Sequence, residues 1–344
     1  MKKICFILTF SLLGNPFCKA SSINEIIKYC RNNIELNTSL GHYANYNVPD
    51  EIYYAKIDGD IFEISYLHID NNSYKKESYT HKTRIDLSKA MVYYSQQTSN
   101  SFSNSHYEYE IQISTFGNQV FHDVTNNTNS KKYSNQGTFF KIGCKDLNTV
   151  NQIIAPLRAA TKLYRPTYSN TEQGCKQAYS QLISSFTAYK IKTENAKKLE
   201  CATTTISSVS YKKGYLTISF VDKSVNCGGG GFVSGRYSLT LKISDLYFRL
   251  FCWYGKSTLY LCSKKDGIEF KTPSGAEIIT QYGFEGTNMV MEKIYRALAS
   301  FQDVVLESDY MGTLGGGSSS SANKQSTNSN KSESITKKVG KYVQ

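Results

Sequence analysis

The chain has 344 residues, of which 40% are hydrophobic, and its 40 Lys and Arg against 28 Asp and Glu give a formal net charge of +12. Three of these charges lie within 1–20 and four lie after Gly315, which leaves +5 for the residues between. Those residues contain no Arg-rich run, so the charge pattern argues against a nucleic-acid-binding protein.

The first residues have the pattern of a secretory signal. Two lysines precede an apolar run at 4–13, which is too short to span a bilayer, and small residues follow at Cys18 and Ala20. We therefore expect a signal peptide at 1–20, cleaved after Ala20, and a secreted or periplasmic protein. A lipoprotein acylated at Cys18 and a retained anchor are the alternatives, and bulky Phe17 argues against the lipoprotein.

Two amphipathic helices, at 148–161 and 288–301, each follow a long stretch of strand-like sequence. This order predicts one β-rich module present twice, at 21–165 and at 171–311. Each module is also expected to open with a helix, near Ile26 in the first copy and near Leu182 in the second.

The two copies share an order of matching segments, although their identity is low. A shift of 156 positions places 84–94 on 240–250. A shift of 154 places Phe62, Ile64 and Tyr66 on Leu216, Ile218 and Phe220. The closing helices align at a shift of 140, so the first copy holds extra residues, for which the polar runs at 95–106 and 124–135 are natural places.

Alternation and β-branched or aromatic content predict about seven strands in each copy. In the first copy they are expected at 51–57, 60–69, 82–88, 90–95, 107–114, 119–124 and 138–143. In the second they are expected at 205–211, 215–221, 237–243, 246–254, 257–263, 267–270 and 276–282. Asp58-Gly59, Lys213-Gly214 and Asp266-Gly267 mark tight turns, and 165–174 suits a linker.

Short antiparallel strands closed by one amphipathic helix resemble, in element order, the pleckstrin-homology-like superfold. The resemblance implies an α+β, mostly β protein with two partly open barrels or bent sheets, each plugged by its closing helix. The Trp common in such helices is missing, so Phe301 or Tyr295 is expected to fill that space in the second copy. Other helix-capped sheets or open barrels are the alternative.

In phosphoinositide-binding members of that superfold, basic residues of an early hairpin hold the lipid head group. Lys212 and Lys213 occupy this place in the second copy, whereas Asp58 and Asp60 occupy it in the first. An exported protein would not normally meet that lipid, so we do not carry the activity over.

No catalytic or cofactor motif emerges from the residues that could carry one. The five histidines, His42, His68, His81, His106 and His122, lack the helical spacing of a zinc enzyme and are expected to be ordinary surface residues. Gly228–Gly231 and the Gly255-Lys256-Ser257 step lack the spacing and helix of a phosphate-binding loop. We therefore assign no catalytic, metal or cofactor-binding residue, and no ligand-binding residue.

Seven cysteines follow the signal: Cys30, Cys144, Cys175, Cys201, Cys227, Cys252 and Cys262. Export permits disulfides, and Cys252 and Cys262 flank a turn across which they could be bridged. The acidic residues Asp58, Asp60 and Glu63 are expected to form a solvated turn.

Tyrosine is the unusual component of the composition, with 27 residues against one Trp. Neighbouring pairs such as Tyr53-Tyr54 and Tyr93-Tyr94 put one ring on each face of a strand. We expect the inner ring to pack in the core, and the outer ring can serve a binding surface.

The tail at 312–344 is rich in Gly, Ser, Asn and Lys and is expected to be disordered, and its basic residues could approach an anionic membrane surface. These observations favour an exported, non-enzymatic binding or scaffolding protein of the cell envelope, with a protein or envelope component as partner. A lipid or small-ligand carrier with a cavity under the closing helix and a secreted hydrolase are the alternatives.

Overall fold

The structure is a computed structural model. The part of the chain that it describes comprises residues 34–40, 43–47, 51–70, 76–96, 108–144, 146–194, 200–225, 232–253 and 256–307. The predicted signal peptide at 1–20, the opening helix near Ile26 and the tail at 312–344 lie outside these residues.

The elements before the linker form what we call the first half. In chain order they are β1 (Ile34–Leu40), β2 (Tyr43–Asn47), β3 (Glu51–Asp58), β4 (Ile61–Asp70), β5 (Glu77–Asp86), the 3-10 turn η1 (Leu87–Lys89), β6 (Ala90–Gln96), β7 (Tyr109–Thr115), β8 (Val120–Asn126), β9 (Lys132–Gly137), β10 (Phe139–Cys144) and α2 (Leu147–Lys162).

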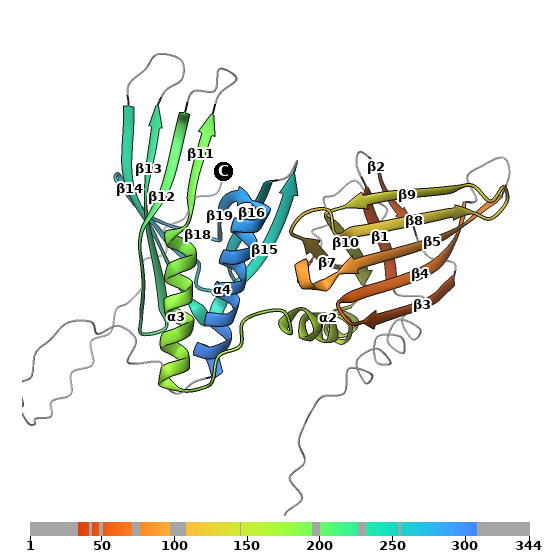
Figure 1. Cartoon of the computed structure of the whole chain (residues 1–344), viewed down its shortest axis with the longest axis horizontal. Coiled ribbons are helices and arrows are strands. Elements are labelled where there is room, and N and C mark those ends of the chain that lie inside the picture. The colour runs from red at the N-terminus through yellow and green to blue at the C-terminus, as the bar shows by residue number, and fades with distance from the viewer. Residues whose placement is uncertain are drawn as a thin grey trace, which may run out of the picture.

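The elements after the linker form the second half. In chain order they are α3 (Glu172–Thr187), β11 (Lys190–Glu194), β12 (Glu200–Lys212), β13 (Tyr215–Val225), β14 (Phe232–Lys242), η2 (Ile243–Asp245), β15 (Leu246–Trp253), β16 (Lys256–Ser263), β17 (Ile268–Thr272), β18 (Gly275–Ile279), β19 (Gln281–Thr287) and α4 (Asn288–Glu307). Figure 1 shows the two halves side by side, with α2 beneath the sheets of the first half and the linker running from α2 to α3.

The two halves arrange their strands in the same order. The larger sheet of the first half runs β3-β4-β5-β8-β9, and the larger sheet of the second runs β12-β13-β14-β17-β18 with β11 added outside β12. The smaller sheets run β10-β7-β6 and β19-β16-β15, and β1 and β2 extend the first of these beyond β10. All paired strands are antiparallel. A duplicated module predicts such a shared order.

The α+β, mostly β class is confirmed, because antiparallel sheets make up most of the described residues and three α-helices accompany them. The described strands of each half form separate open sheets, and none of these sheets closes into a barrel. The finer pleckstrin-homology-like resemblance and the module boundaries at 21–165 and 171–311 stay predictions.

The segments matched in the sequence also occupy matching places in the fold. A shift of 156 positions carries η1 and the start of β6 onto η2 and the start of β15. The two alternating triplets lie in β4 and β13, and all six side chains are buried: Phe62, Ile64, Tyr66, Leu216, Ile218 and Phe220. The first copy is longer between β6 and β7 and at the β8–β9 turn, where the polar runs predicted extra residues.

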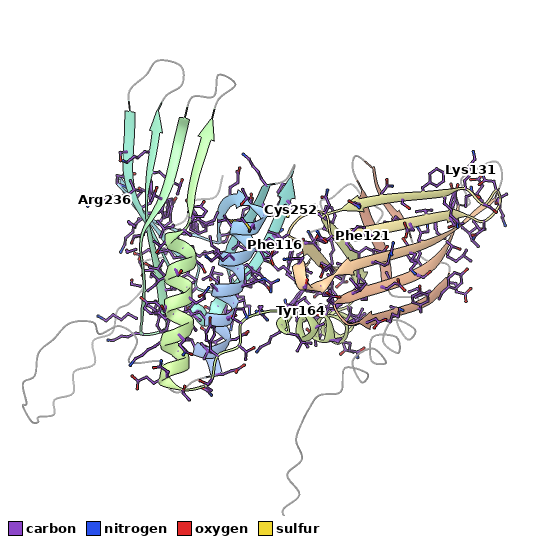
Figure 2. All side chains as sticks on the ribbon, in the orientation of Figure 1. Phe116, Phe121, Lys131, Tyr164, Arg236 and Cys252 are labelled. Atoms are coloured by element: carbon purple, nitrogen blue, oxygen red, sulfur yellow. The ribbon has the colours of Figure 1, made fainter. Side chains whose placement is uncertain are left out.

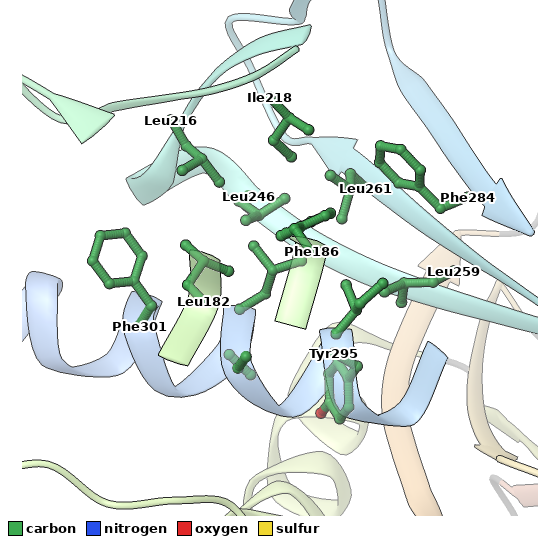
Figure 3. Packing of buried hydrophobic residues seen from close by; sticks show 14 of the residues in the cluster. Leu182, Phe186, Leu216, Ile218, Leu246, Leu259, Leu261, Phe284, Tyr295 and Phe301 are labelled. Atoms are coloured by element: carbon green, nitrogen blue, oxygen red, sulfur yellow. The ribbon is translucent and has the colours of Figure 1, made fainter. Parts of the chain in front are cut away.

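Helices α2 and α4 cover their cores as the helical spacing predicted. The carboxylate of Asp146 caps α2 by accepting a hydrogen bond from the backbone N–H of Thr149 at 2.8 Å. Helix α4 continues past the predicted end at Phe301 to Glu307, because Val304 and Val305 extend its buried face. Figure 3 shows leucines of the two sheets pointing at the helices, with Phe301 and Tyr295 on α4.

Several predicted boundaries were wrong. The run at 124–135 is not one loop, because β9 begins at Lys132. The single strand predicted at 276–282 is two strands, β18 and β19, which belong to different sheets. The linker is shorter than predicted, because the side chain of Thr171 caps α3 and the helix begins at Glu172. The strands β1, β2 and β11 were missed as well.

The two predicted hairpins at Asp58-Gly59 and Lys213-Gly214 are confirmed. Gly59 has a φ of 59°, and Lys213 and Gly214 have φ values of 51° and 84°. Two successive positive values are those of a type I′ turn, which suits the twist of a tight hairpin. Asp266-Gly267 also turns, but it leads from β16 into a strand of the other sheet.

The two halves meet in a packed junction, where Met91, Tyr93 and Phe116 of the first half join the hydrophobic cluster of the second. Figure 2 shows Phe116 and Cys252 close together at this junction. The Cys252 thiol lies 3.1 Å from the carbonyl oxygen of Thr115.

Charged groups also cross the junction. The guanidinium of Arg296 donates to the backbone carbonyl oxygens of Ser88 and Tyr164, and Lys89 pairs with Glu292 at 3.0 Å. Helix α4 is therefore bonded to η1 and to the chain just after α2. These bonds hold one half against the other.

Candidate functional site

Three neighbouring rings cross the inner face of the larger sheet in the first half, and we call them the first ring row: Tyr66 on β4, His81 on β5 and His122 on β8. The Tyr66 and His81 rings lie parallel, with centroids 4.7 Å apart, and the centroids of His81 and His122 are 5.2 Å apart. Ile64 and Thr83 pair with each other one layer before the row, on the same face of β4 and β5. These rings come together because β4, β5 and β8 are neighbours in the sheet, although β8 does not follow β5 directly in the chain.

The two histidines of this row bond to each other inside the protein. His81 Nδ1 lies 3.2 Å from His122 Nε2, and the hydroxyl of Thr83 lies 2.7 Å from His122 Nδ1. Whichever tautomers are present, His81 Nε2 is buried and has no hydrogen-bond partner among the described residues. The bonded nitrogens fix the ring of His122 and leave one imidazole nitrogen of His81 unsatisfied.

Burial controls the ionisation of this pair. His81 is 6% exposed and His122 is 3% exposed. Burial and, to a smaller extent, the neighbouring His122 and His68 together lower the pKa of His81 to about 3. Burial also lowers the pKa of His122 to about 4, although the charge of Asp123 acts in the opposite direction. Both rings are therefore neutral at pH 7.

The second half has a ring row at the same register positions: Phe220 on β13, Tyr237 on β14 and Phe270 on β17. Phe220 pairs with Tyr237 as Tyr66 pairs with His81, and Phe270 lies opposite Leu239 as His122 lies opposite Thr83. Its neighbouring centroids are 5.5 Å and 5.9 Å apart, with interplanar angles of 15° and 13°. The placement of three rings is thus shared, and the two imidazoles occur only in the first row.

The layer beyond each row differs more strongly. In the first half it holds His68, Tyr79 and Asn126, and the carboxylate of Glu77 accepts hydrogen bonds from the last two. In the second half it holds Asp222 and Gly235.

Gly235 is required by its neighbour, because a Cβ there would lie 2.7 Å from the ring of Tyr237. Asp222 Oδ1 is buried and unpartnered among the described residues.

The prediction that the histidines are ordinary surface residues is wrong for His81 and His122. His81 lies opposite buried Tyr66, and His122 lies opposite buried Thr83, so both imidazoles are on the inner face of the sheet. Their polar character alone suggested the opposite. His68 is half-buried, and His42 and His106 lie outside the described residues. Within the described ranges, no group of three or more His, Cys, Asp or Glu side chains is placed to hold a metal ion.

The bridge that the turn would have permitted between Cys252 and Cys262 is not formed. Cys252 pairs in register with Ser257, whereas Cys262 pairs with Tyr247, and the two thiols are not joined. Burial raises the pKa of the Cys252 thiol, although its hydrogen bond with Ser257 acts against this. A neutral thiol is a poor nucleophile, so this site is not set up for covalent catalysis. The side chains of Cys30, Cys201 and Cys227 lie outside the described ones.

The prediction of a solvated acidic turn holds for Asp58 and Asp60 but is wrong for Glu63, which is buried on the outer face of β4. The carboxylate accepts a hydrogen bond from Tyr54 at 2.9 Å and pairs with Lys82 at 3.0 Å. Burial alone would raise the pKa of Glu63, but the contacts with Lys82 and Tyr54 outweigh it and lower that pKa. This carboxylate is a structural anion and is not held protonated for acid catalysis.

The remaining predicted features contribute no site. Gly228–Gly231 lie outside the described residues, and Lys256 in β16 forms an exposed ion pair with Glu285 in β19. Tyr93 is buried and Tyr94 is partly exposed, as the pairing of inner and outer rings predicted. Both Phe301 and Tyr295 are buried beneath the second half's sheets.

One cavity formed by described residues lies near the closing helix of the second half and is too small for a lipid. It has a volume of about 30 Å³ and lies between the linker and the end of α4, lined by Arg165, Tyr168, Ser300 and Asp303 among others. Such a space suits a water molecule or two, whereas small-ligand pockets measure roughly 300–1,000 Å³.

One strand edge of the second half stands out on the surface. In the outermost strand β18, four of the five residues are exposed, and the apolar side chain of Ile278 is 68% exposed. The equivalent outer strand β9 carries Lys132 and other polar side chains, and its Tyr133 is 52% exposed. Lysines discourage pairing at a sheet edge, so β18 is the less protected of the two edges.

Comparisons with known proteins found no matching family model, no matching curated protein and no matching solved structure. Among the described helices, none combines the length and apolar character that crossing a membrane demands.

Proposed function

We propose that this chain is an exported, non-enzymatic binding or scaffolding protein of the cell envelope, and that its partner is another protein. The observation that carries this proposal is the open edge of β18. An outer strand presents unpaired backbone N–H and C=O groups, and an extended segment of a partner can add to them as a further strand.

The surroundings of β18 suit such an added strand. Its neighbour β17 is bonded to β14, so the strand rests on a sheet anchored in the core. Ile278 offers an apolar contact on one face, and Glu277 offers a carboxylate on the other, which favours a partner segment with an apolar and a basic residue. Export rests on the sequence pattern at 1–20.

The alternatives have less support. A lipid or small-ligand carrier requires a cavity under the closing helix, and the 30 Å³ cavity lies beside the end of α4. A hydrolase requires an activated group, and the described thiol at Cys252 and carboxylate at Glu63 are each in a state unsuited to that role.

Cross-linking in the native envelope tests the edge. The full chain would carry a photoreactive side chain at position 278 or, as the matched control on the equivalent strand, at position 133. We expect a discrete protein adduct from position 278 that an Ala276→Pro change, which removes a backbone donor from β18, reduces at least tenfold. Equal adducts from both positions, or an adduct that survives Ala276→Pro, would contradict the proposal. Turnover of a glycan or peptide panel by the purified protein would favour the hydrolase instead.

A further inference from the structure

The two ring rows occupy the same register positions and differ in chemistry, and this difference points to a response to acid. Tyr66, His81 and His122 are replaced in the second half by Phe220, Tyr237 and Phe270 at matching register positions. We propose that the His81–His122 pair is an acid-sensitive switch, which opens the larger sheet of the first half on proton uptake while the second half stays closed.

Among the described residues, no carboxylate is hydrogen-bonded to either imidazole, although the charge of Asp123 favours a proton on His122. The titratable groups that act on it within the described residues are Tyr66 and His68 on β4, Tyr79 on β5 and Asp123 on β8. Asp123 is already bonded to Arg84 at 2.8 Å and to Ser134 at 2.6 Å on the outer face.

Glu77 is likewise held by Tyr79 and Asn126. No described carboxylate contacts either imidazole.

A proton added to this row gains no hydrogen bond. At His81 Nε2 it would face no hydrogen-bond partner among the described residues. The Nδ1 of His81 and the Nε2 of His122 are 3.2 Å apart, so one nitrogen donates and the other accepts. Protonating the accepting nitrogen turns this contact into two facing donors and removes the hydrogen bond. The charge would also lie in a layer bordered by Ile64 and Tyr66, where it is poorly solvated.

Opening relieves this cost, because an exposed histidine takes up a proton near pH 6.5. Below that pH, proton uptake by the open form raises the opening constant by up to about tenfold per pH unit for each histidine. For two histidines the increase between pH 7 and pH 5 is on the order of a hundredfold or more. Phenyl and phenol rings take up no proton in this range, so the second ring row provides an internal reference.

Hydrogen exchange of the full chain measures this directly. Peptides that cover β4, β5 and β8 report on the first half, and peptides that cover β13, β14 and β17 report on the second. After correction for the intrinsic effect of pH on exchange, we expect protection of the first set to fall at least tenfold more than protection of the second set between pH 7 and pH 5. An equal response of the two sets would overturn the proposal.

A graft of the second row into the first isolates the two histidines. The triple variant Thr83→Leu, His81→Tyr, His122→Phe places the residues of the second half at positions 81, 83 and 122, keeps Tyr66, and removes the hydroxyl that bonds His122. We expect its first half to lose the extra acid response, whereas the control His68→Asn keeps it. A graft that responds to acid like the unaltered chain would overturn the proposal.

If the graft does not fold, His122→Phe alone serves, and the acid response should then fall to about half its slope.

Discussion

The two ring rows show how one backbone arrangement carries two different physical roles. In the second row, aromatic rings stack at 5.5 Å and 5.9 Å and contact Tyr282 and Phe284 from the facing sheet, so the row extends the core. In the first row, two imidazoles take the same places and bond to each other and to Thr83. A position in the row therefore holds a planar ring, which can be either a phenyl or phenol ring or an imidazole.

The largest expected effect is the loss of a ring from the second row. Phe220 is buried and lies within 6.5 Å of four other ring centroids, so Phe220→Ala removes a large contact area and leaves a cavity. We expect a loss of about 3–5 kcal/mol in the free energy of unfolding. Chemical denaturation measures it, with exposed Tyr215→Ala in the same strand as the control. A loss below about 1 kcal/mol would show that the row does not extend the core.

The next effect concerns acid and the first row. The pKa of His81 is about 3 and that of His122 about 4 in the folded protein, against 6.5 when exposed, so the folded protein binds fewer protons. Their contribution to stability is complete above pH 6.5 and falls below it by about 1.4 kcal/mol per pH unit for each histidine. Denaturant titrations between pH 7 and pH 5 should show a loss of about 2–4 kcal/mol in the first half. A free energy of unfolding that does not change between pH 7 and pH 5 would mean that the two histidines do not make the first row sensitive to acid.

A smaller effect tests why the layer beyond the rows differs. Gly235→Ala places a Cβ within 2.7 Å of the Tyr237 ring, which has to move from its stack with Phe220. We expect a loss of about 1–3 kcal/mol, as for other overpacked sites. At the equivalent position of the first half, Tyr79→Ala introduces no overlap and is the contrasting variant. Thermal unfolding of both variants measures whether only Gly235→Ala loses stability through overlap. If Gly235→Ala unfolds at the same temperature as the unaltered chain, the Tyr237 ring can accommodate a Cβ at position 235.

The smallest effect concerns the junction. Lys89 is partly exposed, and its pair with Glu292 is screened by solvent, so Lys89→Met should cost about 0.5 kcal/mol or less. Phe116→Ala at the same junction should cost several times more, because Phe116 is buried against Tyr295. Chemical denaturation of the two variants ranks them. A larger cost for Lys89→Met would mean that charge and not packing holds the halves together.

The sequence predicted the parts of the fold whose residues repeat with a period. Phe62, Ile64 and Tyr66 alternate, and their burial followed, as did the faces of α2 and α4. Strand β9 was missed because its residues Lys132–Gly137 are polar and exposed, which leaves no alternation to detect.

The candidate site was only partly accessible to the same reasoning. His81 and Thr83 alternate with Ile85 in β5, and this signal could have placed both on the core face. The contact with His122 could not be predicted, because β5 pairs with β8 across two intervening strands. A pattern within one strand gives the face of a residue, whereas its neighbours depend on which strands pair.

The unequal sharing of side chains at the junction has a consequence for dissecting the protein. Met91, Tyr93 and Phe116 of the first half pack into the hydrophobic core of the second half. In the other direction, Arg296 of α4 donates hydrogen bonds to backbone carbonyl groups of the first half and of the chain just after α2. If residues up to 165 were expressed separately, these three apolar side chains would be exposed to water. The remaining fragment would lack part of its hydrophobic core. Neither fragment is a fair substitute for the intact polypeptide.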